Sequence, residues 1–446
     1  MCRLLTVPAL IALMTPVIHA DLPSYVEAPD PSYSWEQTKN DTTALGTVHH
    51  LTLTSQTWRE NPWNHQFRIY EPAQVDHEDM MVLFITGGSS RSEHKPTDDL
   101  LAFALARSAG CRVAVLPQVP NQPLLGDRYE DDLIAETFVN FLQSGEQDWP
   151  LLQPMVKSAV KAMDAAQEHA NQRGRPVKRF VVTGASKRGW TTWLTGAMDD
   201  RVVGIAPMVI PTLNMKENTK NQLALWGKYS EQIDDYTRRG LTSSFETEDG
   251  AKLWEMVDPY FYLDRITVPV VQINGTNDRY WTHDSMRFYW DKIQGPSYVV
   301  NLPNAGHGLD EHRDYAVNAV GALVRHIATD TEAPEFQWKA VDENGSTRFV
   351  LTTDSNVRPK SVVAWVAQSD DRDLRDDSYT KQSVESQRDD SGSSWTYTLD
   401  RPESGSIAVF FDLTYEVDGL TYHVSTPIHE FRADPSEDTA TGESDE

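Results

Sequence analysis

One short segment in the middle of the chain restricts the fold more than any other. The apolar run Phe180-Val181-Val182 has the character of a buried strand, and it leads directly into the small-residue turn Gly184-Ala185-Ser186. A stretch compatible with a helix begins at Trp190. A strand, a tight turn with one serine and then a helix is the arrangement that presents a serine nucleophile at the end of a parallel sheet. The segment therefore predicts an α/β fold with a mostly parallel sheet.

Two later segments supply an acid and a histidine. They are Ile273-Asn274-Gly275-Thr276-Asn277-Asp278 and Asn304-Ala305-Gly306-His307-Gly308. A serine hydroxyl becomes nucleophilic when a base takes its proton, and the base needs an acid to orient it and stabilise its charged form. The order serine, aspartate, histidine is that of α/β-hydrolases. We therefore predict Ser186 as nucleophile, His307 as base and Asp278 as acid.

Each of these residues also has a structural interpretation. Ser186 alone could cap a helix, and an aspartate after a strand is common in Asx-turns. The second choices are Asp284 and Asp310 for the acid and His283 and His312 for the base. Taken together, however, the three residues each follow a predicted strand and occur in the order serine, aspartate, histidine, which favours the triad. One departure remains, because the usual G-x-S-x-G pattern has glycine where this chain has Arg188, with Gly189 one position later.

Acyl transfer also requires donors for the oxyanion, each of which contributes about 3 kcal/mol to stabilisation of the transition state. The backbone N–H of Lys187 is one candidate, and that of Gly88 or Ser89, after an apolar strand, is the other. The glycine pair at 87–88 could instead be a plain turn. Lys187 and Arg188 place two cations beside the serine, which favours an anionic substrate group, although either could be held by a surface acid.

The remaining patterns extend the α/β prediction. Apolar or alternating runs predict strands at 48–58, 66–70, 80–86, 112–116, 202–210, 268–273 and 298–302, and helical spacing predicts helices at 98–109, 131–142 and 151–172. Residues 21 to about 50 are expected to be extended. Between 212 and 264 lies a polar, aromatic-rich helical insertion, which we interpret as a lid within a hydrolase domain spanning 21–330. Its aromatics could alternatively pack a small core of their own.

The C-terminal part of the chain changes to short alternating runs. Strands are predicted at 347–352, 361–367, 394–399, 407–415 and 421–425, separated by turn residues. This spacing predicts an all-β sandwich of immunoglobulin or fibronectin type III character at 331–432. Residues 433–446 form an acidic tail without a basic residue, which predicts disorder.

The N-terminus and the composition restrict location and partners. Arg3, an apolar run and a small residue before Asp21 predict a signal peptide at 1–20 with cleavage near Ala20, hence a secreted or periplasmic protein without a membrane span. Cys111 then stays alone and is expected to be buried. A formal charge of -26 disfavours nucleic-acid binding. The histidines lack metal-ligand spacing and no phosphate-binding loop is present, so no metal or cofactor is expected.

Several stretches resemble the PhoPQ-activated pathogenicity-related protein family, of the PqaA type. The likeness spans roughly residues 25 to 430. The segments that carry it are Trp149-Pro150-Leu151-Leu152, Pro154-Met155-Val156-Lys157-Ser158-Ala159-Val160, Gly184 to Leu194, Leu213-Asn214-Met215, Trp226-Gly227-Lys228-Tyr229-Ser230, Asp235-Tyr236 and Asp258-Pro259-Tyr260. The resemblance implies an α/β-hydrolase fold and an exported protein, in a family linked to a two-component virulence regulator and to resistance against antimicrobial peptides.

The serine turn is also similar to that of glucuronoyl esterases, whose turn carries a basic residue after the serine. That likeness favours esters of acidic sugars. We expect an exported serine hydrolase that cleaves a carboxylic ester of a small molecule or saccharide through an acyl-enzyme, with Arg188, Trp190 and Trp226 contacting substrate. A catalytically weak binding or signalling protein and a serine peptidase are the alternatives.

Overall fold

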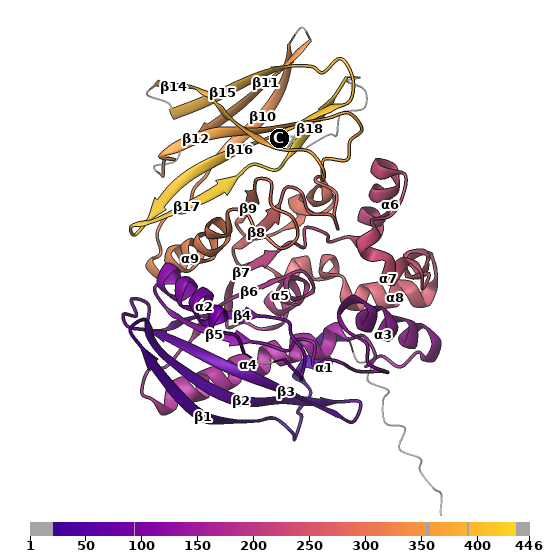
Figure 1. The fold of residues 1–446 in the computed structure, drawn as a ribbon, viewed down its shortest axis with the longest axis vertical. Helices are drawn as coiled ribbons and strands as arrows, with labels where there is room; N and C mark the ends of the chain where they lie inside the picture. Colours follow the sequence, from indigo (N-terminus) through magenta and orange to yellow (C-terminus); the bar gives the residue numbers. More distant parts are fainter. Residues whose placement is uncertain (1–20, 93, 344, 354–356, 390–391, 434–446) are drawn as a thin grey trace, which may run out of the picture.

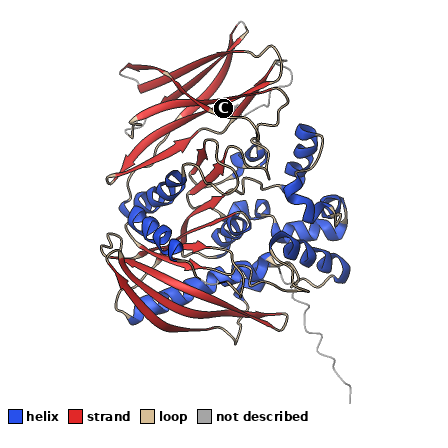
Figure 2. Ribbon diagram, in the orientation of Figure 1, coloured by secondary structure: helices blue, strands red, loops and turns tan. Residues whose placement is uncertain are grey.

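The computed structural model describes residues 21–433, apart from 93, 344, 354–356 and 390–391 (Figure 1). The predicted signal peptide at 1–20 and the acidic tail beyond Ala433 lie outside the described residues. Helices and strands alternate through the first three quarters of the chain, and strands alone follow (Figure 2).

A long mixed sheet organises the molecule. Its order is β1-β2-β3-β5-β4-β6-β7-β8-β9, continuing into C-terminal strands. Pairing is parallel from β5 through β4, β6, β7 and β8 to β9, and antiparallel at the β1-β2-β3 edge. The bounds are β1 (Ser34–Thr43), β2 (Gly46–Trp58), β3 (Asn61–Pro72), β4 (Met80–Ile85), β5 (Arg112–Leu116), β6 (Arg179–Ala185), β7 (Val202–Met208), β8 (Val270–Gly275) and β9 (Ser297–Leu302). The predicted α/β fold class is confirmed.

The register aligns the carboxyl ends of the parallel strands at one edge. Ile85 of β4 pairs with Gly184 of β6, and Gly275 of β8 pairs with Leu302 of β9. The loops that follow these strands therefore emerge on the same side of the sheet, which is where open α/β sheets hold their sites. These loops carry Gly88, Ser186, Asp278 and His307.

Helices cover both faces of the sheet, as buried apolar strands require. One face packs against α2 (Pro96–Ala109) and α9 (Arg313–Thr329), and this layer buries Cys111 as predicted. Burial raises the pKa of the Cys111 thiol to about 12. The other face packs against α3 (Glu130–Ser144), α4 (Leu152–Gln172) and α5 (Lys187–Met198).

A short helix, α1 (Leu22–Glu27), begins the described chain, where an extended segment was expected. The Asp21 carboxylate accepts a hydrogen bond from the Ser24 backbone N–H at 2.9 Å, and Pro23 occupies the first turn. Both features favour helix initiation. The prediction for the region 21–50 was therefore wrong at its start, although β1 within it is extended.

The insertion between β7 and β8 is helical. It comprises α6 (Met215–Trp226), η1 (Glu231–Ile233), α7 (Asp234–Thr237), η2 (Leu241–Glu246), α8 (Glu248–Val257) and η3 (Pro259–Arg265). Phe245 and Trp254 stack with ring centroids 4.5 Å apart, and Trp254 meets Phe138 of α3 edge-on at 5.7 Å. Part of the aromatic content of the insertion thus forms a packed core against α3.

The C-terminal strands form two antiparallel sheets around a shared apolar core. One contains β10 (Gln337–Glu343), β11 (Ser346–Thr353), β15 (Gly392–Asp400) and β14 (Glu385–Asp389); the other contains β17 (Leu420–Ser425), β16 (Ser406–Val417), β12 (Ser361–Ser369), β13 (Thr380–Ser383) and β18 (His429–Arg432). The second sheet joins the main sheet, because Ser425 of β17 pairs with Val299 of β9. Patterning did not indicate this continuity, nor the strands β10, β13, β14 and β18.

No helix in the described ranges combines the length and apolar character needed to cross a membrane.

Candidate active site

Ser186 lies in a strained turn between β6 and α5. Its backbone has φ 58° and ψ -125°, a region that non-glycine residues rarely occupy. Gly189, one position later than the usual pattern, makes the close approach that the turn needs. A Cβ at Gly189 would lie 2.8 Å from the Met208 carbonyl oxygen and 2.7 Å from Ile210 Cγ2. The turn thus has the geometry of a nucleophile elbow, with the glycine requirement moved to Gly189.

Asp278 and His307 meet across the loops that follow β8 and β9. His307 Nδ1 lies 2.7 Å from Asp278 Oδ2, and Asp278 Oδ1 accepts the Tyr280 backbone N–H at 2.8 Å. Gly275 permits this approach, because a Cβ there would lie 2.4 Å from the Ala305 carbonyl oxygen. The carboxylate therefore holds the histidine ring through Nδ1 and leaves Nε2 for another partner.

The second ring nitrogen of His307 is buried and, within the described residues, makes no hydrogen bond. The Tyr280 ring stacks on His307 with centroids 4.1 Å apart. Tyr280 also lines a cavity of about 60 Å³ together with Ser186, Lys187 and Trp190. His307 is not among the residues that line this cavity, so Tyr280 is the neighbour that connects the histidine with the Ser186 cavity. Across the described part of the chain, the Ser186 hydroxyl makes no hydrogen bond either.

Lys187 and Arg188 are both held by acids of α3. Arg188 donates to both carboxylate oxygens of Glu130, at 2.6 and 2.7 Å, and Lys187 Nζ lies 3.0 Å from Asp131 Oδ2 and 3.2 Å from Glu130 Oε2. Each cation is only 8% exposed. Of the two interpretations open for these cations, pairing with acids is the one observed.

Glu130 is the centre of this charge network. Burial acts to raise the pKa of Glu130, but the hydrogen bonds and charge of Arg188 and the charge of Lys187 outweigh it and lower the pKa to about 2. Asp131 extends the network into the insertion by accepting the Tyr236 hydroxyl at 2.9 Å. The carboxylates thus neutralise the cations beside Ser186 and connect α3 with the insertion.

The loop after β4 contains the second predicted oxyanion donor. Gly88 has φ +103°, and its carbonyl accepts Gln122 Nε2 at 3.0 Å. The Ser89 backbone N–H is already bonded to Ser92 Oγ at 2.9 Å. Within the described residues the Gly88 N–H makes no hydrogen bond, so of the two candidates it is the one free to donate to an oxyanion.

The other predicted contacts divide between two places. Trp190 lines the Ser186 cavity and donates its indole N–H to the Val257 carbonyl at 2.5 Å. Trp226 is not among the residues lining that cavity; its ring lies under the Arg375 guanidinium, 3.8 Å from the ring centroid, and lines a separate small pocket with Asp278. The predicted contacts of Trp190 and Trp226 thus fall in different cavities.

The second-choice acids and bases make other contacts. Asp284 pairs with Arg287 at 3.2 Å and His283 with Glu430 at 3.5 Å. Asp310 is exposed and pairs with Arg313, while His312 packs edge-on against Trp365. These contacts leave Asp278 as the acid that meets His307.

A loop from the C-terminal strands holds the acid and histidine loops in place. The Asn277 side-chain amide donates to the carbonyls of Leu374, Arg375 and Asp377, at 3.3, 3.2 and 2.7 Å. Asn304 exchanges two hydrogen bonds with the backbone of Tyr379, at 2.7 and 3.0 Å. We call residues 374–379 the clamp loop. It contacts the residue before Asp278 and a residue three before His307.

In the ranges that the structure describes, no group of three or more histidine, cysteine, aspartate or glutamate side chains is arranged to hold a metal ion.

A family model described as PhoPQ-activated pathogenicity-related protein matches residues 22–375. The chain belongs to the PhoPQ-activated pathogenicity-related family. Among proteins similar to this family member is Autocrine proliferation repressor protein A of Dictyostelium discoideum. The two are 33% identical over 386 residues, which cover 82% of this chain and 78% of that protein.

Solved structures similar to this member of the PhoPQ-related family include esterases. Acetyl xylan esterase 1 from Thermoanaerobacterium sp. JW/SL YS485 is 17% identical with a TM-score of 0.47, over 68% of this chain and 93% of that one. A glucuronoyl esterase from Solibacter usitatus is 13% identical with a TM-score of 0.44, over 68% and 92%. The fold class of this chain follows from the order and direction of its strands.

Sequence patterns did not indicate several residues of the site in this PhoPQ-related protein. Glu130 and Asp131 belong to a run of acids at the start of a helix, which ordinarily interacts with the helix dipole. Tyr280 is one aromatic among many, and Asn277 looks like a turn residue. Only their tertiary contacts distinguish them.

Proposed function

We propose that this protein is a serine hydrolase that cleaves a carboxylic ester, with Ser186 as nucleophile, His307 as general base and acid, and Asp278 as the residue that orients His307. The Asp278–His307 contact of 2.7 Å, with a buried and unbonded Nε2 beside the Tyr280 wall of the Ser186 cavity, carries the proposal. His307 Nε2 and the Ser186 hydroxyl both lack partners among the described residues and both lie next to Tyr280, which suits a proton transfer that substrate binding completes.

The proposed reaction has two steps. Ser186 Oγ attacks the ester carbonyl carbon while His307 Nε2 takes its proton, and the resulting oxyanion accepts hydrogen bonds from the N–H groups of Lys187 and Gly88. Collapse releases the alcohol, which receives the proton from His307, and leaves an acyl group on Ser186. Water then attacks this acyl-enzyme with His307 again as base, and the acid product departs.

The site geometry favours a small acyl group. The cavity of about 60 Å³ beside Ser186 accommodates only a few water-sized groups. An acidic sugar as the acyl part has less support than the sequence suggested, because Glu130 and Asp131 already neutralise Lys187 and Arg188. We therefore propose a short-chain ester, with export remaining part of the proposal through the signal sequence at 1–20.

Labelling with a fluorophosphonate probe and turnover of 4-nitrophenyl acetate test this assignment. Ser186→Ala is expected to abolish labelling and to lower kcat about 10⁴-fold or more, because the attacking atom is lost. Ser243→Ala, an exposed serine in the insertion, serves as the matched control and should label normally. Unchanged labelling of the Ser186→Ala protein would refute the mechanism.

One observation favours a second candidate function. The Dictyostelium relative is named as an autocrine repressor of proliferation, and it is 33% identical to this chain. A hydrolase fold can serve binding alone. An intact protein that neither labels nor turns over any ester, while retaining a partner in a pull-down, would favour the signalling function.

A peptidase has weaker support. Asp131 is the acid that lines the Ser186 cavity, and it is already engaged by Lys187 and Tyr236. It therefore offers no uncommitted carboxylate to the amino terminus of a peptide.

A further inference from the structure

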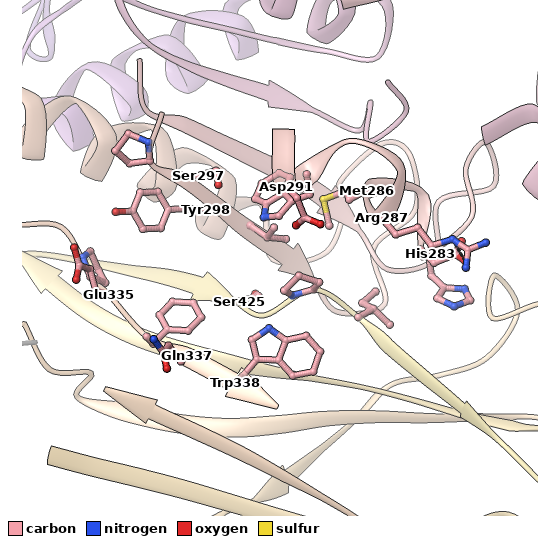
Figure 3. Close-up of a pocket in the computed structure, with 18 residues that line it drawn as sticks. His283, Met286, Arg287, Asp291, Ser297, Tyr298, Glu335, Gln337, Trp338 and Ser425 are labelled. Atoms are coloured by element: carbon pink, nitrogen blue, oxygen red, sulfur yellow. Dashed lines mark ion pairs between the residues drawn. The ribbon is translucent and has the colours of Figure 1, made fainter. Parts of the chain in front are cut away.

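A groove of about 980 Å³ lies between the α/β part and the C-terminal strands. Figure 3 shows Trp338, Gln337 and Glu335 of the C-terminal part on one side and Asp291, Ser297 and Tyr298 on the other. Its size is typical of ligand sites, which often form at the junction of two structural units. None of its lining residues lines the Ser186 cavity.

Four aromatic side chains line this groove. Trp290 and Tyr298 come from the α/β part, and Phe336 and Trp338 from the first C-terminal strand and the residues before it. All four are only half-buried, so part of each ring faces the groove. Half-buried aromatic rings present flat apolar surfaces at low conformational cost, together with a polar atom in Trp and Tyr.

Among the described residues, the groove contains three exposed polar side chains without partners, beside others that are engaged, such as His283, Asp284 and Ser425. In the described parts of the chain, the side chains of Asp291, Glu335 and Gln337 make no hydrogen bond or ion pair. The one guanidinium that lines the groove is engaged, because Arg287 pairs with Asp284 at 3.2 Å and donates to Asn221 at 2.8 Å. The groove therefore presents free carboxylates and a free amide without a free cation.

These features restrict the class of ligand. Uncommitted carboxylates in a chain of charge -26 repel anions. A cation needs only acceptors, whereas this groove also offers donors: the Gln337 amide and the indole N–H groups of Trp290 and Trp338. Sugar hydroxyls both donate and accept, and the C–H faces of a sugar ring suit flat aromatic surfaces. We propose that the groove binds a neutral oligosaccharide.

This proposal does not depend on the hydrolase assignment. Binding at the groove can be measured without turnover, and the two sites share no lining residue. They are nevertheless neighbours through a smaller pocket, which shares His283 and Ile428 with the groove and contains Asp278. A saccharide held in the groove would lie close to the loop that carries the proposed catalytic acid.

Isothermal titration of the full-length protein tests the proposal. The probes are cellohexaose, xylohexaose and chitohexaose as neutral chains, hexagalacturonate as the anionic chain and hexalysine as the cationic one. At least one neutral chain is expected to bind with a Kd below about 1 mM, a modest affinity of roughly -4 kcal/mol. Absence of saturable binding by all three neutral chains would overturn the proposal.

Variants locate the binding. Trp338→Ala should weaken binding about tenfold by removing one stacking surface, whereas Phe261→Ala, a matched aromatic that is 49% exposed and outside the groove, should change nothing. Because Trp338 also packs against the C-terminal core, thermal unfolding must first show that the variant is folded. If it is not, Gln337→Ala, whose side chain is exposed, decides instead, and unchanged affinity there would overturn the proposal.

Removing the two carboxylate charges of the groove distinguishes a neutral sugar ligand from a cationic one. The double variant Asp291→Asn with Glu335→Gln keeps hydrogen-bonding oxygens but removes both charges. Binding of the neutral chain should stay within about threefold, since neutral hydroxyls need acceptors and not charge. If hexalysine binds preferentially and this binding is lost in the double variant, the saccharide proposal is overturned and the ligand is a cation.

Discussion

At the scale of single residues, Arg188 shows how the serine turn departs from the common pattern. A large residue is tolerated there because its guanidinium lies against Gly87, where a Cβ would be only 2.6 Å from Nη2. Its Nε donates to the Val119 carbonyl at 2.5 Å, and its two terminal nitrogens bind Glu130. Arg188 thus ties the serine turn to Gly87 in the loop after β4, to Val119 and to α3, a structural role that glycine could not perform.

Replacing Glu130 tests the strength of this network. Glu130→Gln should destabilise the fold by about 3 kcal/mol, because it leaves the nearly buried guanidinium of Arg188 without its carboxylate partner, whereas Lys187 keeps Asp131. The control Glu246→Gln breaks an exposed pair with Lys216 and should cost under about 1 kcal/mol. Denaturant unfolding at pH 7 gives both values, and similar losses in the two variants would contradict the prediction.

The pH dependence of the same network has a definite sign. The folded pKa of Glu130, about 2, lies below its ordinary value of 4.5, so the carboxylate stabilises the folded state at any pH above 4.5. This stabilisation is lost as the pH falls through the window from 4.5 to 2. The difference in unfolding free energy between the wild type and Glu130→Gln should therefore be constant above pH 4.5 and shrink below it. A difference that grows on acidification would contradict the assignment.

At the scale of elements, the clamp loop at 374–379 joins a C-terminal segment to both loops of the proposed catalytic pair. Asn277 and Asn304 make all of these contacts through side-chain amides, which satisfy backbone carbonyls in the clamp loop. Loops held by several hydrogen bonds are restricted in the positions that they can adopt. We regard Asn277 and Asn304 as positioning residues for Asp278 and His307.

Asn277→Asp tests this positioning role. The new carboxylate cannot donate and would face three carbonyl oxygens, so the loop that carries Asp278 should shift. We expect kcat for 4-nitrophenyl acetate to fall roughly 10²-fold with KM little changed, since a displacement of about 1 Å costs that much. Asn171→Asp, an exposed asparagine of α4, is the control. A lower melting temperature with kcat intact would limit Asn277 to a structural role.

At the scale of the whole molecule, the C-terminal strands continue the main sheet. Ser425 of β17 pairs with Val299 of β9, and Asn301 donates to the Thr426 carbonyl at 3.0 Å. Ala322 of α9 is buried in the apolar core of the C-terminal sheets. The C-terminal part therefore covers a face and an edge that the α/β part would otherwise expose.

Deleting the C-terminal part should accordingly prevent stable folding. A chain ending at Ala333 leaves β9 as an uncovered edge strand and exposes Tyr298 and Ala322, and both changes promote aggregation. Soluble yield and melting temperature should both drop sharply relative to a control chain ending at Ala433. A soluble truncated protein with an unchanged melting temperature would show that the α/β part folds independently.

The sequence by itself determined the α/β fold class, most of the strands and the succession of serine, acid and histidine loops. These features depend on local patterns, because apolar runs, turn residues and helical spacing are written in consecutive residues. Even the serine turn was indicated, since Gly184 and Ala185 precede Ser186 and Gly189 follows three positions later. The catalytic role of Ser186, Asp278 and His307 stays a prediction until the labelling experiment.

Only the tertiary structure decided which residues become partners. Arg188 lies 58 positions from Glu130, and Asn277 lies 97 from Leu374, so no local pattern connects them. Whether a cation is free for substrate or paired with an acid depends on the packing of distant elements. The sequence contains many acids that could form such a pair. The pairing of β9 with β17 was also decided by the tertiary structure, because strand pairing depends on which sheet edges meet in the folded chain.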